Sequence, residues 1–125
     1  MGARKLIDPT FAEHFAEEWI AGWNEHDIEK ILSHYTEDFS VDTPLAIKRL
    51  PETKGLIQGK DNIRAYWGKA LENNPSLQFR LIDICCGINC LAIYYESLSI
   101  QKQVVENLFF NDEMKVEKAI MMYSK

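Results

Sequence analysis

Trp19-Ile-Ala-Gly-Trp-Asn-Glu-His-Asp27, with Tyr35-Thr-Glu-Asp-Phe39 and Pro44-Leu45 shortly after it, is the stretch that decides the fold. It predicts the end of an amphipathic helix, a tight polar corner, a second short helix and an outgoing strand, with almost no residues between them. Such a corner lays two helices across a sheet, and the rest of the sequence has to supply that sheet.

The helix before the corner is marked at both ends. Asp8-Pro9-Thr10 opens it, and Thr10 followed by Glu13 fits a capping box, in which each side chain binds a backbone N–H group that would otherwise lack a partner. Aromatic side chains then recur at every fourth position, which places them on one helix face. These residues are Phe11, Phe15, Trp19 and Trp23.

After the corner, Asp27 is the expected N-cap of the second helix, and a strand with Phe39, Val41, Thr43 and Leu45 on one face follows it. Pro44 would mark an edge or a bulge of that strand. In residues 47–58 the apolar residues recur with neither helical nor strand spacing, so we expect a loop that could cover the mouth of a cavity. A third helix begins at residues 59–61 and ends at 73–75.

The second half of the chain predicts only strands. They span residues 77–86, 90–98, 102–111 and 115–123, and each break holds turn-forming residues. Helices gathered early and antiparallel strands gathered late are typical of an α+β fold. At 125 residues and 46% apolar composition, we expect residues 1–125 to form one domain.

Composition excludes several function classes. A net charge of −5 and the lack of a Lys/Arg cluster argue against nucleic acid as a partner. The longest uncharged stretch, 84–95, is too short to cross a membrane, and residues 1–10 lack the apolar core of a signal peptide, so the expected location is cytoplasmic. Cys85, Cys86 and Cys90 are expected to be buried, reduced thiols, with no metal site and no cofactor.

Three motifs carry a resemblance to a known family: Trp23-Asn24-x-His26-Asp27-Ile28, Tyr35-x-x-Asp38-Phe39 and Gly59-Lys60-x-x-Ile63-Arg64-x-Tyr66-Trp67. Together with the element order they resemble the SnoaL-like branch of the NTF2-like superfamily over about residues 10–123. The resemblance implies a cystatin-like cone, in which three helices from the N-terminal half pack on a curved, mostly antiparallel sheet around an apolar pocket. The superfamily includes polyketide cyclases, ketosteroid isomerases, dehydratases and non-catalytic binding domains, so fold alone does not fix activity.

The catalytic pattern of the ketosteroid isomerases is only partly present. Those enzymes use a strand carboxylate as base, with a tyrosine hydroxyl and a protonated carboxylic acid as donors. Matched motif to motif, the base position falls on Thr43, which cannot act as a base near neutral pH. The two tyrosine positions fall on Trp19 and Trp67, and the acid position falls on Glu106. Ketosteroid isomerisation is therefore not expected.

Glu106 is the best single catalytic candidate. If its strand turns Val104, Leu108 and Phe110 inward with it, burial would raise the pKa of the carboxyl group and suit it to acid–base chemistry. Alternatively, this face meets solvent or a partner, and the inward residues are Val105, Asn107 and Phe109.

For several other candidates, an exposed or structural position is the alternative to a role in the site. Asp42 could reach the cavity if Pro44 shifts the register, or could face solvent. Glu96 could form a carboxylate dyad with Glu106, or lie exposed on the sheet. The family match directs Met121 and Tyr123 at the pocket, while His26 is expected to form local hydrogen bonds in the helix corner.

Two hypotheses of function remain open. The first is a small-molecule protein with an apolar, aromatic-lined pocket, acting without a cofactor as an isomerase, cyclase or dehydratase on a small apolar or aromatic molecule. The alternative is a non-catalytic ligand-binding or dimerisation domain. Apolar residues on both faces of the late strands predict a homodimer through the sheet. These are Ile93, Leu98, Val104, Val105, Phe109 and Phe110.

Overall fold

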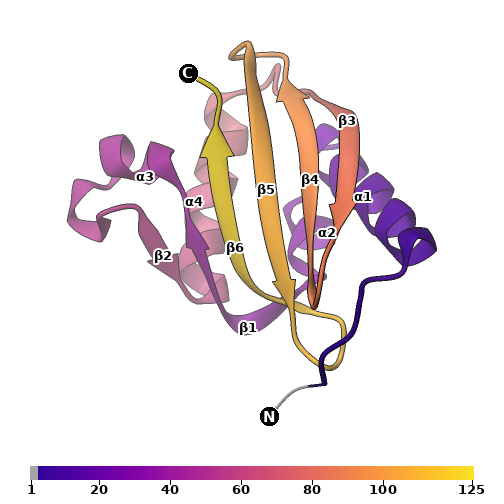
Figure 1. Ribbon diagram of the computed structural model, residues 1–125. Helices are drawn as coiled ribbons and strands as arrows, with labels where there is room; N and C mark the ends of the chain where they lie inside the picture. The colour runs from indigo at the N-terminus through magenta and orange to yellow at the C-terminus, as the bar shows by residue number, and fades with distance from the viewer. Residues whose placement is uncertain (1–2) are drawn as a thin grey trace.

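The described helices all lie within residues 9–73, and four antiparallel strands follow them, which confirms the predicted α+β class. The computed structural model describes residues 3–125. Its elements are α1 Pro9–Asn24, α2 Ile28–Leu32, β1 Tyr35–Asp42, α3 Pro44–Arg49, η1 Pro51–Thr53, β2 Leu56–Gln58, α4 Lys60–Asn73, β3 Phe79–Cys86, β4 Cys90–Ser97, β5 Lys102–Phe110 and β6 Val116–Tyr123 (Figure 1). The four late strands match the predicted ranges within two residues at each end.

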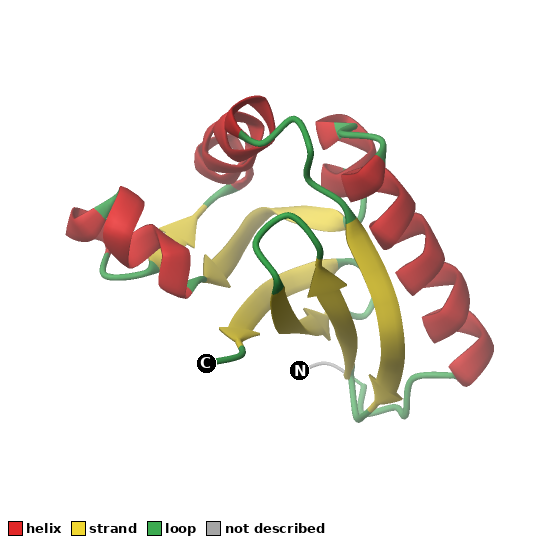
Figure 2. Ribbon diagram, turned by 90° about the horizontal axis from the view of Figure 1, so that it is seen from above, coloured by secondary structure: helices red, strands yellow, loops and turns green. Residues whose placement is uncertain are grey.

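The sheet has six strands in the order β2-β1-β6-β5-β4-β3. Only the β1–β6 pair is parallel among these neighbours, so the sheet is mostly antiparallel, as predicted. The sheet curves, and the long helices lie on its concave side (Figure 2). There α1 packs against β3 and α4 packs against β1, which produces the expected cone.

The start of α1 differs from the predicted capping box. Asp8 is the N-cap, and its carboxylate accepts hydrogen bonds from the backbone N–H groups of Thr10 and Phe11 at 3.0 and 3.1 Å. Pro9 occupies the first helical position, where its fixed φ suits the helix and its missing N–H group costs nothing. Thr10 therefore lies inside the helix, and the Thr10–Glu13 prediction was wrong.

Hydrogen bonds join the polar corner between α1 and α2 to the backbone at the beginning of β3. The side-chain amide of Asn24 donates to the carbonyl of Phe79 at 2.9 Å and accepts from the N–H group of Phe79 at 2.7 Å. A ring nitrogen of His26 lies 3.1 Å from the carbonyl oxygen of Leu77. The Trp-Asn-x-His-Asp motif therefore fixes α1 on the sheet.

The second helix starts as predicted. Asp27 caps α2 by accepting a hydrogen bond from the N–H group of Lys30 at 3.1 Å. The two helices meet closely at Gly22, where a Cβ atom would lie 3.1 Å from Cγ1 of Ile31. The absence of a side chain at Gly22 thus permits the tight turn of the chain.

Residues 43–58 are more ordered than predicted. β1 ends at Asp42, and Pro44 opens the short helix α3 instead of continuing a strand. Within the expected loop, β2 pairs antiparallel with β1, with Val41 opposite Ile57. The prediction missed α3 because six residues are too few to establish a helical period.

The cysteines also lie elsewhere than predicted. Cys85 and Cys86 are exposed at the end of β3, Cys90 is half-buried, and all of these thiols are free. In the part of the chain that the structure describes, no helix is long and apolar enough to cross a membrane.

Candidate functional site

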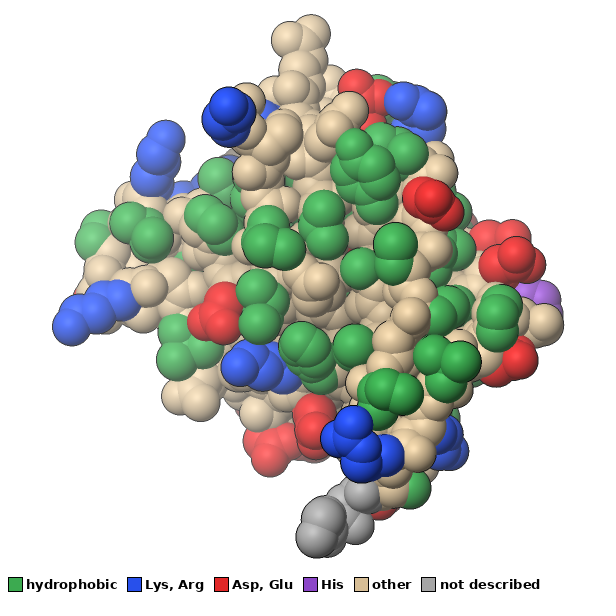
Figure 3. All heavy atoms as spheres, viewed as in Figure 1, with side chains coloured by type: hydrophobic (Ala, Val, Ile, Leu, Met, Phe, Trp, Pro, Cys, Tyr) green, Lys and Arg blue, Asp and Glu red, His purple; other side chains and the backbone are tan. Residues whose placement is uncertain are grey.

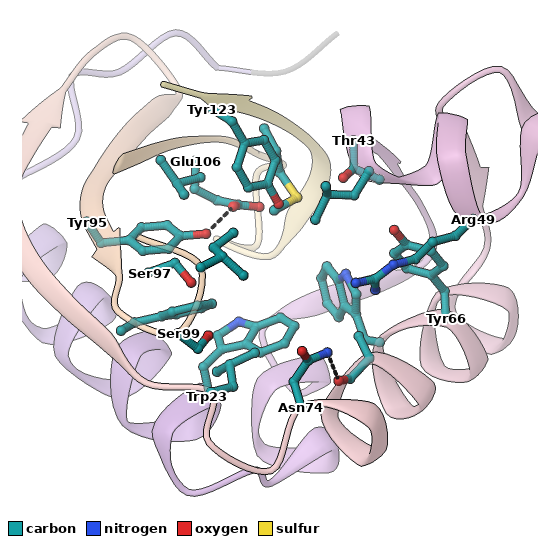
Figure 4. Close-up of a pocket in the computed structure, with 18 residues that line it drawn as sticks. Trp23, Thr43, Arg49, Tyr66, Asn74, Tyr95, Ser97, Ser99, Glu106 and Tyr123 are labelled. Carbon is teal, nitrogen blue, oxygen red and sulfur yellow. Dashed lines mark hydrogen bonds between the residues drawn. The ribbon is translucent and has the colours of Figure 1, made fainter. Parts of the chain in front are cut away.

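A cavity opens between the concave face of the sheet and the helices (Figure 4). The space within it that the centre of a water molecule can occupy is about 80 Å³. Its walls are largely aromatic and aliphatic, with a few polar groups among them. The lining residues are Trp23, Thr43, Leu45, Arg49, Tyr66, Trp67, Ala70, Asn74, Leu77, Phe79, Tyr95, Ser97, Ser99, Ile100, Val104, Glu106, Met121 and Tyr123.

Glu106 is the buried carboxylic acid of this cavity. Its inward orientation follows from strand alternation, because Val104, Leu108 and Phe110 on the same face of β5 are also buried. In the sheet it lies between Ile93 of β4 and Met121 of β6. The side chain is 0% exposed, so its charge would have little contact with water.

The two oxygens of this carboxyl group have different surroundings. The hydroxyl of Tyr95 donates to Oε1 at 3.3 Å, whereas Oε2 is buried without a hydrogen-bond partner. Burial raises the pKa of Glu106 to about 8, and the Tyr95 hydrogen bond opposes this only in part. Glu106 is therefore mainly a neutral acid at pH 7, and can donate a proton from Oε2.

Tyr123 lies beside Glu106, whereas Thr43, Arg49 and Tyr66 lie across the cavity from it (Figure 4). Burial raises the pKa of Tyr123, and the nearby Glu106 carboxyl group adds to this effect. Burial also raises the pKa of Tyr66, although Arg49 and Thr43 beside its hydroxyl act in the opposite direction. These phenols are therefore neutral donors near pH 7.

Unpartnered polar atoms concentrate in this cavity. Within residues 3–125, the buried side-chain polar atoms without a hydrogen-bond partner are Nε1 of Trp23, the hydroxyl oxygen of Tyr66 and Oε2 of Glu106. All of these residues line the cavity. Native proteins pair nearly all such groups, so their convergence is typical of a site that binds the polar groups of a ligand.

The structure brings several of the sequence-predicted residues together. Thr43, Trp67, Met121 and Tyr123 line the cavity with Glu106. Thr43 follows β1 directly as the N-cap residue of α3, and its side chain makes no capping hydrogen bond. A hydroxyl group thus occupies the position that the resemblance assigns to a base.

Trp19 does not line the cavity, contrary to the prediction. Its ring packs against Phe79 and Tyr95, with ring centroids 6.0 and 5.3 Å apart, and its N–H group donates to the hydroxyl of Tyr35 at 2.9 Å. This bond satisfies the buried indole within the core. Trp23, one helical turn later, reaches the cavity instead.

The two further carboxylates lie apart from Glu106. Asp42 is not among the cavity-lining residues, because β1 turns its neighbours Val41 and Thr43 inward and Asp42 to the other face. Glu96 points outward from β4 and forms an ion pair with Arg80 at 2.6 Å. The Glu96–Glu106 dyad is therefore wrong, and Asp42 is placed outside the site.

Sequence reasoning missed Trp23, Arg49, Tyr66 and Tyr95 as site residues. Tyr95 could have been found, because the alternation of Leu91 and Ile93 along β4 extends to it. No sequence pattern indicated Arg49, since its place in the site depends on helix α3, which was not predicted. Within residues 3–125, no three His, Cys, Asp or Glu side chains gather in a way that could hold a metal ion.

Known proteins similar to this chain belong to the family that the sequence motifs resemble. The sequence profile of the SnoaL-like domain matches residues 16–99. A SnoaL-like protein of unknown function from Burkholderia thailandensis is 34% identical, with a TM-score of 0.93 over 97% of this chain and 100% of that chain. The comparison with curated proteins gives no match.

More distant structures share the fold. One from Agrobacterium tumefaciens, provisionally described as an isomerase of the SnoaL-like family, is 17% identical, with a TM-score of 0.71 over 93% of this chain and 99% of that chain. Another from Kribbella flavida, provisionally described as a ketosteroid isomerase, is 13% identical, with a TM-score of 0.65 over 91% of this chain and 78% of that chain.

Proposed function

The chain belongs to the SnoaL-like domain family, and we propose that its cavity binds a small, largely apolar molecule bearing an oxygen function. We further propose that Glu106 transfers a proton to and from this molecule without a cofactor, as in an isomerase, cyclase or dehydratase. The observation that supports this most directly is the unpartnered Oε2 of a fully buried, mainly neutral carboxyl group in an aromatic cavity.

The proposed step is proton transfer through one carboxyl group. Neutral Glu106 donates its proton from Oε2 to a carbonyl oxygen of the ligand, and the resulting carboxylate then removes a proton from the adjacent carbon. The product is the enol, and Glu106 returns to its acid form, so protons balance. The hydroxyl of Tyr95 stabilises the transient carboxylate through its hydrogen bond to Oε1.

The alternative is a non-catalytic ligand-binding domain. It is supported by Thr43 at the position of the base, and by Glu106 being the only carboxylate among the described residues that line the cavity. In that case the same polar atoms would orient a ligand without moving a proton.

An exchange experiment separates the two functions. 2-Acetylnaphthalene has acidic protons next to its carbonyl group, and their exchange in D₂O can be followed by NMR. If Glu106 transfers protons, the wild type accelerates this exchange, and Glu106→Gln retains the affinity for the probe but loses at least about 100-fold in exchange rate. Glu117→Gln, on the exposed face of β6, is the matched control. Binding by the wild type without acceleration would refute catalysis and leave the binding function.

We also propose that the outer face of the sheet pairs with a second copy of the chain. Hydrophobic side chains gather over the sheet in Figure 3, and Met122 is 52% exposed there, next to half-buried Val105, Phe109 and Ile120. The predicted patch was too large, since Ile93, Val104 and Phe110 belong to the core.

The free thiols of Cys85 and Cys86 are exposed, which fits a reducing compartment, and we propose that the protein is located in the cytoplasm.

A further inference from the structure

The cavity continues outward into a groove between α4 and residues 49–58. Arg49, Tyr66, Ala70 and Asn74 line both spaces, so these residues form the boundary between them. The groove is much the larger, with about 930 Å³ open to the centre of a water molecule against about 80 Å³ inside. A ligand that extends from Glu106 past this boundary, which we call the exit of the cavity, would enter the groove beside Arg49 and Tyr66.

This exit is positively charged although the protein is acidic. Arg49 and Lys69 line the outer groove, and none of its described lining residues is Asp or Glu. The chain as a whole has a net charge of −5. Local positive charge of this kind attracts an anion to the groove.

Arg49 differs from Arg64 and Arg80 in its surroundings. Arg64 forms ion pairs with Glu29 and Asp61, and Arg80 pairs with Glu96. Within residues 3–125, Arg49 forms no ion pair, and its guanidinium lies close enough to the hydroxyl of Tyr66 to oppose the rise in the pKa of that phenol. Figure 4 shows Arg49 and Tyr66 on the helical side of the cavity, opposite Glu106 and Tyr95.

We propose that the ligand carries an anionic group, a carboxylate or a similar acid, which Arg49 and Tyr66 bind at the exit of the cavity while its oxygen function meets Glu106. A guanidinium and a phenol beside each other supply parallel donors for the oxygens of a carboxylate. Glu106 does not repel such a ligand, because burial keeps it neutral near pH 7. The inference rests on the proposed function and defines the substrate as a keto acid or a related oxo acid.

A pair of matched probes tests this inference. 6-Acetyl-2-naphthoate carries the ketone and a carboxylate, and 2-acetylnaphthalene carries the ketone alone. The indole N–H resonance of Trp23 in the ¹⁵N-labelled chain reports occupancy, because Trp23 lines the cavity and its N–H group has no hydrogen-bond partner in the protein. The N–H resonance of Trp19, bonded to Tyr35 in the core, reports that the fold is intact.

The wild type should bind the carboxylate probe about tenfold more tightly than the neutral probe, as one charge-assisted contact predicts. Arg49→Met should abolish this preference, whereas Lys48→Met, an equal loss of charge at the neighbouring residue, which lines neither the cavity nor the groove, should retain it. Equal affinities for the two probes, or a preference that survives Arg49→Met, would overturn the anionic ligand while leaving the proposed function intact. Failure of both probes to shift the Trp23 resonance would overturn the cavity as the binding site, and the proposed function with it.

Discussion

Replacing Glu106 with Gln should change how the stability of the protein depends on pH. In the folded chain the pKa of Glu106 is raised from 4.5 to about 8 because the carboxyl group is buried. Below pH 4.5 both folded and unfolded chains hold the proton, and the carboxyl group has no effect. Between pH 4.5 and pH 8 only the unfolded chain releases the proton, so stability falls as the pH rises.

The magnitude follows from the two pKa values. Each pH unit between them lowers the free energy of unfolding by about 1.4 kcal/mol. At pH 7 the accumulated loss is about 3 kcal/mol, and above pH 8 it levels off at about 4–5 kcal/mol for a shift from 4.5 to about 8. This is a large part of the stability of a domain of this size.

Urea unfolding of the wild type and Glu106→Gln at pH 4, 7 and 9 measures the effect. Since Gln does not titrate, the stability of the variant relative to the wild type should rise by about 4–5 kcal/mol from pH 4 to pH 9. Any constant cost of placing an amide in the site cancels in this comparison. Glu117→Gln, exposed on β6, should follow the wild type at every pH. A rise below about 1 kcal/mol would show that Glu106 ionises in the folded protein much as it does in the unfolded chain, and would refute the reasoning.

Two further predictions concern the corner and the sheet. Asn24→Ala removes both hydrogen bonds to the backbone of Phe79 and should lower the free energy of unfolding by about 2–3 kcal/mol, whereas Asn62→Ala, whose amide makes one exposed hydrogen bond, should cost less than about 1 kcal/mol. Equal losses in urea unfolding would mean that the corner does not hold α1 on β3. In sedimentation at micromolar concentration the wild type should be a dimer and Val105→Asp, on the outer face of β5, a monomer. A monomeric wild type would contradict the proposed dimer.

The predictable parts of the fold are those in which a repeating pattern of apolar residues extends over many positions. The aromatic repeat of α1 and the alternation of the late strands extend over enough residues to establish a helix face or a sheet face. The segment after Asp42 is different, because Pro44 is compatible with both an edge strand and the first position of a helix. Its true conformation depends on β2 pairing with β1, a contact that no local pattern reveals.

The site was predictable where it lies on those strands. Glu106 shares a face with Leu108 and Phe110, and alternation allows only one other orientation for all of them. On α1, both Trp19 and Trp23 face inward, and only the three-dimensional partners decide which reaches the cavity. Tyr35 satisfies the indole of Trp19, whereas the indole of Trp23 has no such partner.

Thr43 and Glu106 together restrict the chemistry that this cavity can perform. Because a threonine hydroxyl does not accept a proton near neutral pH, in the proposed reaction the group that gives the first proton also receives the second. Such a reaction succeeds only where the two proton positions on the ligand lie within reach of one carboxyl group, as they do on a carbonyl oxygen and the carbon next to it. The ligand must then be held with little freedom, and an apolar wall alone orients it poorly. An anionic group bound by Arg49 at the far end would supply that orientation, so one acid and one distant cation could replace the second catalytic carboxylate.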